Sequence, residues 1–404
     1  MEKYGLIGQG IGKSLSPFIH SRFFDYNYGL FELEENEVEK KLKERDFDGL
    51  NVTIPFKKTV MPYLDFIDKK AEEIGSVNTI VNKNGALYGY NTDYFGFIKT
   101  LEKVGFDAKN KKALVLGSGG ASLSIRQALV DLGSSEVITV SRSGENNYSN
   151  LSRHSDASII VNTTPVGKYP NNGEKPLSLN GFKRLEAVID INYNPIKSAL
   201  LIEAQKNNIS VSGGLTMLVF QAKKSAELFT GKAVENEKAE AVEDEIIKKM
   251  KNIVFIGMPS CGKSTVGKIV AKRLDRAFFD TDEMVKKTNA LSPSEIIVKS
   301  GEKVFRNMET DEVLKAAKET GAVISVGGGA VLKEENVDAL KQNGILVYLD
   351  RPLDELISSD RPLSKDIPKL FGERKQFYEK AADIKIKSLE TAEETAKAVI
   401  EKLF

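Results

Sequence analysis

Residues 252–265 read NIVFIGMPSCGKST, and this stretch decides the fold of the C-terminal part of the chain. Residues 253–256 are apolar and mostly β-branched, which predicts a buried strand. Residues 257–265 fit the phosphate-loop pattern G-x-x-x-x-G-K-[ST], and the KSTVGKIVAKRL segment that begins within the loop predicts a helix. A strand, a glycine-rich loop and a helix in this order predict a nucleoside triphosphate site in a parallel α/β sheet.

The loop residues have separate expected roles. Backbone N–H groups should hold the phosphates, Lys263 should reach the β- and γ-phosphates, and Ser264 should bind Mg²⁺. The predicted ATP contacts are Ser260, Cys261, Gly262, Lys263, Ser264 and Thr265. Cys261 is the only cysteine, which excludes an intrachain disulfide and a cysteine-based zinc cluster. The sequence has no N-K-x-D guanine-reading signature, which disfavours a GTPase.

The whole chain has 404 residues, a length that predicts roughly two to three domains. Residues 230–251 are rich in Ala, Glu and Lys and carry only a thin apolar stripe, so we expect a helical or partly flexible linker there. We place the linker at 236–250, between an N-terminal module at 1–235 and a kinase-like module at 251–404. Alternating β-branched runs and amphipathic stretches predict parallel α/β sheets in both modules.

The charge balance argues against some partners. The chain has 58 basic and 57 acidic residues, no basic block and no Trp, so we expect no nucleic-acid partner and no membrane-surface partner. We also expect no signal sequence and no membrane span, and therefore a cytoplasmic protein. Homo-oligomerisation is left open.

A second glycine-rich loop lies in the N-terminal module. The strand-like run KKALVLG leads into GSGGAS at 117–122, a variant of G-x-G-x-x-G in which glycines allow a tight turn and close approach of a pyrophosphate. The predicted loop contacts are Gly117, Ser118, Gly119, Gly120 and Ala121. This pattern alone is weak, because a glycine-rich turn without a ligand is about as frequent.

The end of the next predicted strand favours NADP over NAD. An NAD site usually has Asp or Glu there, to bind the ribose 2′-hydroxyl. This chain has Ser141, Arg142 and Ser143 instead, a guanidinium and two hydroxyls that suit a 2′-phosphate. A solvated surface arginine is the alternative interpretation.

Several motifs in fixed order resemble shikimate dehydrogenase over residues 1 to about 235. They are GKSLSP, NVTIPFK, GSVNT, GYNTD, GSGGAS, NTTPVG, DINYNP and GGLTMLVFQA. The resemblance implies an α/β, two-lobed dehydrogenase, with an α/β substrate lobe at about 1–98 plus 215–235 and a Rossmann NADP lobe at about 99–214. One departure is Thr216, which stands where the family commonly has Gly.

The same resemblance implies residue roles in reducing 3-dehydroshikimate. Lys57 and Asp93 would form the catalytic pair. Ser14 and Ser16 would bind the substrate carboxylate. The remaining substrate contacts would be Thr53, Asn78, Gln221 and Tyr193, while Ile191 and Gly214 would line the nicotinamide side.

In the C-terminal module, FFDTDE places Asp280 and Asp282 at the carboxyl end of a predicted strand, where α/β sheets bind ligands. One acid could bind metal and the other a substrate hydroxyl; an N-cap and a surface charge are the alternative.

These acids, with VFRNME, SVGGGA, DRPLS and GERKQFY, resemble shikimate kinase over residues 251–404. The resemblance implies a parallel sheet flanked by helices. Asp282 would bind and deprotonate the acceptor hydroxyl, Arg306 and Arg374 would clamp its carboxylate, and the Gly328 backbone would pack against its ring. Asp280 would join Ser264 at Mg²⁺, and Arg361 on the lid would close over the ATP phosphates. The lid region is shorter than usual and lacks an upstream Arg, which predicts weaker ATP binding or a more open lid.

Together the two modules predict a bifunctional enzyme of aromatic amino-acid biosynthesis that uses NADP(H), ATP and Mg²⁺. The first module would make shikimate and the second would phosphorylate its 3-hydroxyl. Two alternatives stay open: an active dehydrogenase whose kinase half is a degenerate nucleotide sensor, and a quinate/shikimate dehydrogenase.

Overall fold

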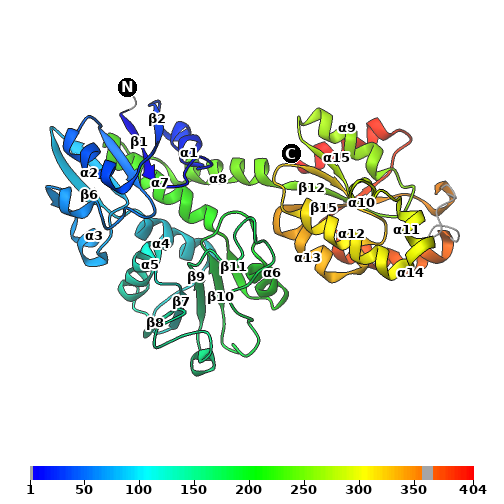
Figure 1. Ribbon diagram of the computed structural model, residues 1–404, viewed down its shortest axis with the longest axis horizontal. Coiled ribbons are helices and arrows are strands. Elements are labelled where there is room, and N and C mark those ends of the chain that lie inside the picture. The colour runs from blue at the N-terminus through cyan, green and yellow to red at the C-terminus, as the bar shows by residue number, and fades with distance from the viewer. Residues whose placement is uncertain (1–2, 357–366) are drawn as a thin grey trace. The chain divides into compact units, whose positions relative to one another are not determined.

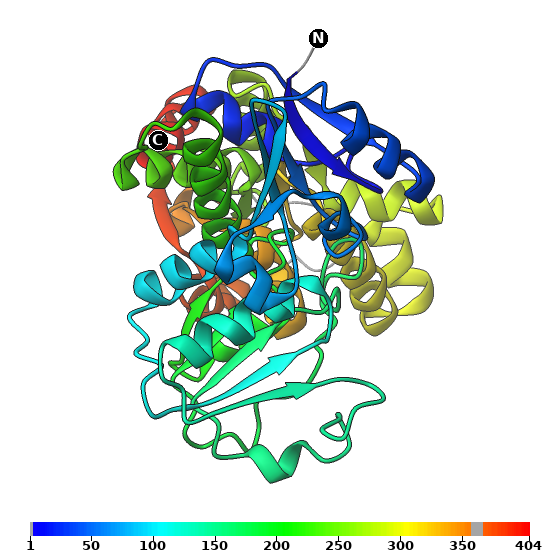
Figure 2. The same ribbon diagram turned by 90° about the vertical axis from the view of Figure 1, so that its left-hand side faces the viewer.

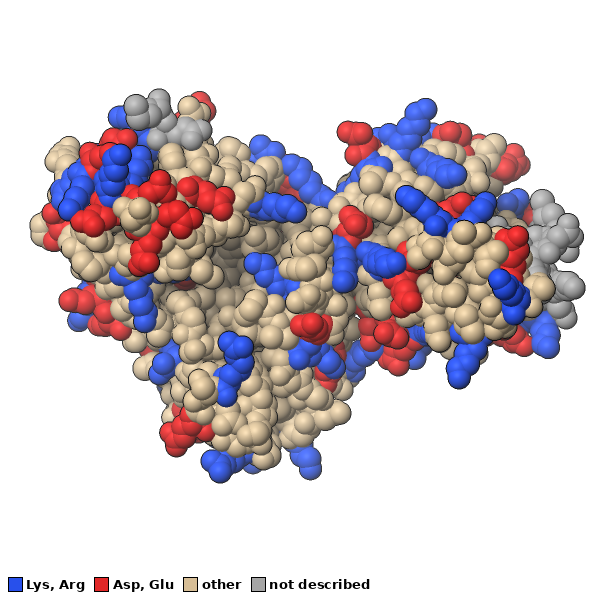
Figure 3. Space-filling model, viewed as in Figure 1, with Lys and Arg blue, Asp and Glu red and all other residues tan. Residues whose placement is uncertain are grey.

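The computed structural model describes residues 3–356 and 367–404 (Figure 1). The chain forms two compact units. The N-terminal unit comprises Met1–Gly167, Glu174–Tyr193 and Glu203–Ile246, and the C-terminal unit comprises Lys168–Gly173, Asn194–Ile202 and Ile247–Phe404. On the face shown in Figure 3, basic and acidic side chains are interspersed.

The first lobe of the N-terminal unit contains a six-stranded mixed sheet in the order β2-β1-β3-β5-β6-β4. Its strands are β1 (Tyr4–Gly8), β2 (Tyr28–Glu32), β3 (Gly49–Val52), β4 (Phe66–Ile67), β5 (Thr79–Lys83) and β6 (Ala86–Tyr90). Its helices are α1 (Ser16–Phe23), α2 (Glu35–Glu44) and α3 (Lys69–Ile74). Strands β5 and β6 form a hairpin whose turn, Asn84 and Gly85, has positive φ at both residues, as the tight turn of a two-residue hairpin requires.

The second lobe contains a parallel five-stranded sheet in the order β11-β10-β9-β7-β8. Its strands are β7 (Lys112–Leu116), β8 (Glu136–Val140), β9 (Ile159–Asn162), β10 (Ala187–Asp190) and β11 (Ser210–Ser212), with helices α5 (Gly120–Asp131) and α6 (Ala199–Lys206). In Figure 2 this sheet, cyan to green, is seen below the blue strands of the first lobe. The strand predicted from KKALVLG is therefore confirmed as β7.

Two helices connect the lobes. α4 (Asp93–Val104) leads from β6 to β7, and α7 (Gly214–Thr230) leads from β11 back to the first lobe, so that both lie between the sheets (Figure 1). They pack closely because Gly96 has no side chain: a Cβ there would lie 2.5 Å from the carbonyl oxygen of Met217. After α7, residues 236–250 form helix α8 (Asn236–Met250).

The C-terminal unit contains a parallel sheet in the order β13-β14-β12-β15-β16. Its strands are β12 (Asn252–Ile256), β13 (Phe278–Asp280), β14 (Val323–Ser325), β15 (Gly344–Asp350) and β16 (Ile384–Lys387). Its helices are α9 (Lys263–Arg273), α10 (Thr281–Asn289), α11 (Pro293–Ser300), α12 (Glu302–Ala317), α13 (Glu334–Asn343), α14 (Ile367–Ala381) and α15 (Ala392–Leu403).

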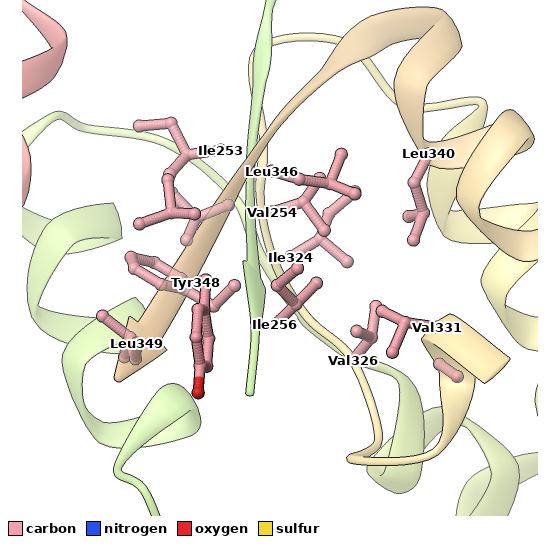
Figure 4. Close-up of a cluster of buried hydrophobic side chains, with 14 of the residues drawn as sticks. Ile253, Val254, Ile256, Ile324, Val326, Val331, Leu340, Leu346, Tyr348 and Leu349 are labelled. Carbon is pink, nitrogen blue, oxygen red and sulfur yellow. The ribbon is translucent and has the colours of Figure 1, made fainter. Parts of the chain in front are cut away.

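Strand β12 is buried on both faces, which explains its continuous apolar run. In Figure 4, Ile253 points to one side of the strand while Val254 and Ile256 point to the other, among residues of β14 and β15. The doubly covered strand ends directly at the phosphate loop, so this core fixes where the loop begins. None of the described helices is long and apolar enough to cross a membrane. Cytoplasmic location, homo-oligomerisation and the absence of a nucleic-acid partner stay predictions.

One buried histidine in the first lobe predicts a pH dependence of stability. His20 is 0% exposed, its Nδ1 lies 2.6 Å from Tyr26 Oη, and its ring stacks on Tyr28. Burial lowers the pKa of His20 to about 3. The unfolded chain takes up a proton on the His20 ring near pH 6.5, whereas the folded chain does not. The buried neutral ring therefore makes its full contribution to the free energy of unfolding above that pH. This contribution falls by ~1.4 kcal/mol per pH unit as the pH drops below it.

We therefore expect His20→Phe, which keeps a stacking ring, to flatten this dependence. The difference in unfolding free energy between wild type and variant should shift by about 2 kcal/mol, in favour of the variant, between pH 7 and pH 5. Urea unfolding at both pH values measures it. An unchanged difference would show that His20 does not remain neutral in the folded state.

Candidate active sites

The centre of the first candidate site is an ion pair between Lys57 and Asp93. Lys57 Nζ lies 2.5 Å from Asp93 Oδ2, and both side chains are largely buried. The other oxygen, Asp93 Oδ1, accepts a hydrogen bond of 2.9 Å from Asn78 Nδ2. Asn78 Oδ1 in turn accepts from the Thr92 backbone N–H at 2.7 Å. The carboxylate is therefore held in one orientation, with its ammonium partner fixed beside it.

Helix α7 brings a further predicted residue to the same place. The Thr92 hydroxyl contacts Gln221 Oε1 at 3.3 Å, so Gln221 joins Asn78 and Asp93 around the start of α4. Asn78 follows α3 and precedes β5, while Asp93 is the first residue of α4. Asn78 and Asp93 meet because the antiparallel β5–β6 pair returns the chain to the same end of the sheet, whereas Gln221 reaches them from α7.

The two predicted carboxylate-binding serines lie at the start of α1. Ser14 Oγ donates to Ser16 Oγ at 3.1 Å and accepts from the Ser16 backbone N–H at 3.2 Å. Thr53, just after β3, packs against Gly8, where a Cβ would lie only 2.3 Å from Thr53 Cγ2. In the described residues, no hydrogen bond or ion pair joins Ser14, Ser16 or Thr53 directly to the Lys57–Asp93 pair.

A buried polar network near the pair was not predicted from the sequence. Asn51 accepts from the Tyr28 hydroxyl at 2.7 Å and donates to Ser225 Oγ at 2.8 Å. Ser225 Oγ also lies 3.0 Å from Thr92 Oγ1. Asn51 shares a strand face with Thr53, a pattern that could have identified it, but its partner Ser225 is 174 residues away in sequence.

The glycine-rich loop of the second lobe lies between β7 and α5. Gly117 has a φ of +109°, and a Cβ there would lie 2.6 Å from Thr163 Oγ1, so Gly is required. Gly119 caps α5, and a Cβ built on it would meet no atom within 4 Å among the described residues. The free amides of a helix start beside such open space are suited to bind a pyrophosphate. Gly120 also lies close to Lys57, since a Cβ on it would be 3.5 Å from Lys57 Cδ.

The predicted 2′-phosphate residues follow the end of β8. Ser141 N–H donates to the Asn146 carbonyl oxygen at 3.0 Å, which shapes the turn, and the Arg142 side chain is exposed. On the other side of the sheet centre, Gly214 packs against the end of β10: a Cβ there would lie 2.0 Å from the Ile191 carbonyl oxygen. Tyr193 lies in the segment after β10, and burial raises the pKa of its hydroxyl.

The phosphate loop of the C-terminal unit has the strained backbone that such loops need. Gly257, Ser260 and Gly262 have positive φ values of 144°, 65° and 95°. Lys263 is 8% exposed, and its Nζ donates to the carbonyl oxygens of Gly257 and Met258 at 3.0 and 2.8 Å. The ammonium therefore lies inside the loop, where a bound phosphate would take over these contacts. Cys261 beside it is buried.

The predicted magnesium residues meet across two elements. Ser264 Oγ donates to Asp280 Oδ2 at 2.5 Å and lies 3.3 Å from Ser325 Oγ. Asp280 also caps α10 through its other oxygen, which accepts from the backbone N–H of Asp282 at 3.1 Å. Asp280 is therefore also the N-cap of α10, which was the alternative interpretation of an acid at this position. Hard oxygen donors at a phosphate loop fit Mg²⁺, which keeps waters and phosphate oxygens as its remaining ligands.

A cavity next to the phosphate loop contains the predicted acceptor residues. Its lining includes Pro259 of the loop, the acid Asp282, the arginines Arg306 and Arg374, and Gly328. Arg374 is 5% exposed, and the Tyr378 hydroxyl donates to the Gly328 carbonyl oxygen, which fixes α14 against this backbone. Arg361 lies outside the described residues.

Glu309 also lines this cavity, although the sequence patterns did not identify it as a site residue. Its Oε2 lies 2.6 Å from Arg306 Nη1, and its Oε1 is buried with no hydrogen-bond partner among the described residues. Burial raises the pKa of Glu309, against the opposing effect of Arg306. The VFRNME motif contains both residues at a spacing of three, which puts them on one helix face.

Comparison with known proteins assigns both parts of the chain. The family model described as shikimate dehydrogenase substrate binding domain matches residues 6–80, and the one described as shikimate kinase matches residues 259–404. The shikimate dehydrogenase (NADP(+)) of Clostridium perfringens strain 13 is 38% identical, over 62% of this chain and 99% of its own length. That of Caldanaerobacter subterraneus is 39% identical, over 56% of this chain and 91% of its own length.

Two solved structures resemble the N-terminal part. A chorismate mutase/shikimate 5-dehydrogenase fusion protein from Clostridium acetobutylicum has a TM-score of 0.59 and 33% identity, covering 61% of this chain and 97% of that chain. Shikimate 5-dehydrogenase from Thermus thermophilus, in complex with NADP(H) and shikimate, has a TM-score of 0.56 and 29% identity, covering 61% and 99%. The chain belongs to the shikimate dehydrogenase family through its N-terminal part and carries a shikimate kinase domain at its C-terminus.

Proposed function

We propose that this chain is a bifunctional enzyme that reduces 3-dehydroshikimate to shikimate with NADPH and then phosphorylates the 3-hydroxyl of shikimate with ATP. One observation carries the proposal. The lining of the cavity beside the phosphate loop includes Asp282, Arg306 and Arg374, which offer the carboxylate and guanidinium groups that a hydroxylated carboxylate needs, in a chain whose other part belongs to the shikimate dehydrogenase family. We keep the division into modules at 1–235 and 251–404 as part of this proposal.

When bound, NADPH would supply a hydride to the ring ketone, and negative charge would develop on the ketone oxygen. The Lys57 ammonium stabilises this oxygen and donates a proton to it. Asp93 keeps the ammonium in place, and Asn78 keeps Asp93 in place, as the 2.5 and 2.9 Å contacts support. Ser14 and Ser16 bind the substrate carboxylate. Thr53, Gln221 and Tyr193 complete its contacts.

The cofactor would be held by the second lobe. Backbone N–H groups at 117–121 bind the pyrophosphate at the start of α5, and Ile191 and Gly214 border the nicotinamide. Lys57 lies near the glycine-rich loop, since a Cβ built on Gly120 would be 3.5 Å from Lys57 Cδ, and this nearness supports a ketone bound between the two lobes.

In the kinase reaction, Arg306 and Arg374 bind the shikimate carboxylate as charged forks. Asp282 accepts the proton of the attacking 3-hydroxyl. Lys263 stabilises the transferring phosphoryl group, while Ser264 and Asp280 hold Mg²⁺. Glu309 keeps Arg306 oriented toward the cavity, and Arg361 is proposed to contact the nucleotide.

A single assay tests the proposal. The full-length chain is mixed with 3-dehydroshikimate, NADPH, ATP and Mg²⁺, while NADPH oxidation, ADP release and the mass of the product are followed. We expect both outputs and a phosphorylated product. NADPH oxidation without ADP, even when shikimate is supplied directly, would favour a degenerate nucleotide sensor. Oxidation of quinate with NAD at a higher rate would favour a quinate/shikimate dehydrogenase.

Arg142 should determine the preference for NADPH. Arg142→Ala removes the charged fork proposed to bind the 2′-phosphate, so kcat/KM for NADPH should fall about 100-fold while that for NADH changes by less than about threefold. Arg184→Ala is a matched control, because Arg184 is exposed and precedes β10, at the amino end of the sheet. Equal losses with both cofactors would contradict this role.

A further inference from the structure

Helix α8 carries a buried carboxylate that the proposed reaction does not use. Glu243 is 3% exposed, and its Oε1 accepts hydrogen bonds from Thr216 Oγ1 at 2.7 Å and from Lys103 Nζ at 2.9 Å. Its Oε2 is buried without a hydrogen-bond partner among the described residues. Burying a charge is costly unless it is compensated, so the two donors are essential to its presence there.

The two donors lie on the helices that connect the lobes. Lys103 is in the last turn of α4, and Thr216 is in the first turn of α7. Both positions are at the second-lobe ends of these helices, since α4 leads into β7 and α7 follows β11. The Glu243 carboxylate thus ties the two connecting helices to each other at one end.

Other contacts fix α8 to the first lobe. Lys238 Nζ donates to the Phe23 carbonyl oxygen at 2.9 Å, and Glu245 pairs with Arg22 of α1 at 2.8 Å. α8 therefore touches α1 on one side and the second-lobe ends of α4 and α7 on the other. It links the first lobe to the connecting helices, and Glu243 makes the hydrogen bonds to those helices.

The position of the lobes matters for the proposed chemistry. Lys57 and Asp93 belong to the first lobe, whereas the glycine-rich loop and Ile191 belong to the second. Where α4 and α7 cross, a Cβ on Gly96 would lie 3.1 Å from Gln221 Cβ, so a shift of either helix moves site residues directly. Misplacing reacting groups by about 1 Å can slow a reaction about 100-fold.

We propose that Glu243, through Thr216 and Lys103, is a positioning residue for the dehydrogenase reaction and sets the spacing of the two lobes. This inference rests on the proposed function. It also accounts for Thr216, which stands where the family commonly has Gly, because glycine has no side chain that could donate this hydrogen bond.

Two substitutions in the full-length chain test the inference. Thr216→Val keeps the side-chain shape and removes the donor, and Glu243→Gln removes the charge opposite Lys103. We expect the kcat for reduction of 3-dehydroshikimate to fall about tenfold in each. The deuterium isotope effect with 4-deuterated NADPH should rise, because hydride transfer becomes slower relative to product release. Kinase turnover with shikimate and ATP should stay unchanged, which also shows that the C-terminal unit is folded.

Glu240→Gln is the matched control, since Glu240 is an exposed carboxylate on the same helix and takes no part in the contacts described above. Lys103→Met, at a half-exposed side chain, probes the same carboxylate if a buried variant does not fold. If kcat and the isotope effect in the Thr216 and Glu243 variants stay within twofold of the control, even with a lower melting temperature, Glu243 is only structural and the inference is wrong. A wild-type chain that does not reduce 3-dehydroshikimate would refute the proposed function, and the inference with it.

Discussion

Lys57→Ala is expected to lower the rate of 3-dehydroshikimate reduction about 1,000-fold, or ~4 kcal/mol in activation free energy. The variant loses both the proton donor and the positive charge opposite the developing alkoxide, and these two effects act on the same oxygen. It also leaves the buried Asp93 carboxylate without its ion-pair partner, although Asn78 still donates to it. Stopped-flow measurement of NADPH oxidation at saturating substrate gives the rate.

Two comparisons make this prediction specific. Lys58→Ala alters the neighbouring lysine, whose side chain is exposed, and should leave reduction within about twofold of wild type. With shikimate supplied directly, the Lys57→Ala variant should phosphorylate it at the wild-type rate. If NADPH oxidation in Lys57→Ala falls less than about tenfold, another group must protonate the ketone oxygen.

The sequence predicted those parts of the fold and sites whose pattern is local. The run NIVFIG followed by GMPSCGKST is one continuous strand, loop and helix, and the structure confirms β12 and α9 there. KKALVLG likewise leads to β7 and the glycine-rich loop. In such segments, hydrophobic periodicity and glycine positions determine the backbone without help from distant residues.

Features built from distant residues could not be predicted in this way. Glu243 was placed in a charged linker, because nothing near it in sequence shows that Thr216 and Lys103 surround it in the fold. Ser225 looked like one polar residue on a helix, whereas it contacts Asn51 and Thr92 from other elements. A buried polar side chain is recognised only through its partners, and these come from packing rather than from local sequence.

Glu309 is an intermediate case. Its pairing with Arg306 is local, at a spacing of three on α12, but this spacing is also typical of exposed helix pairs of little consequence. Its burial at the cavity comes from the approach of the Gly327–Gly329 backbone, where a Cβ on Gly327 would lie 2.2 Å from Glu309 Oε1. The burial of Glu309 therefore depends on both α12 and the Gly327–Gly329 backbone, and one sequence motif does not predict it.

Lys263→Met should abolish phosphorylation of shikimate, with kcat reduced about 1,000-fold, while reduction of 3-dehydroshikimate continues at the wild-type rate. Methionine keeps most of the buried volume of Lys263, so the phosphate loop should stay folded. It cannot supply the positive charge that compensates the transferring phosphoryl group. ADP release measured with shikimate and ATP gives the rate, and NADPH oxidation in the same sample reports the other reaction.

Lys272→Met is the matched control, because Lys272 lies on the same helix α9 with an exposed side chain, and its kinase rate should equal that of wild type. Product analysis then separates the two activities: Lys263→Met should accumulate shikimate from 3-dehydroshikimate, whereas Lys57→Ala should accumulate neither shikimate nor its phosphate. Since Lys263 and Lys57 belong to different units, their effects should not overlap. Loss of reduction in Lys263→Met would mean that the two units do not work independently, and the proposal of two separate sites would have to be replaced by one of coupled sites.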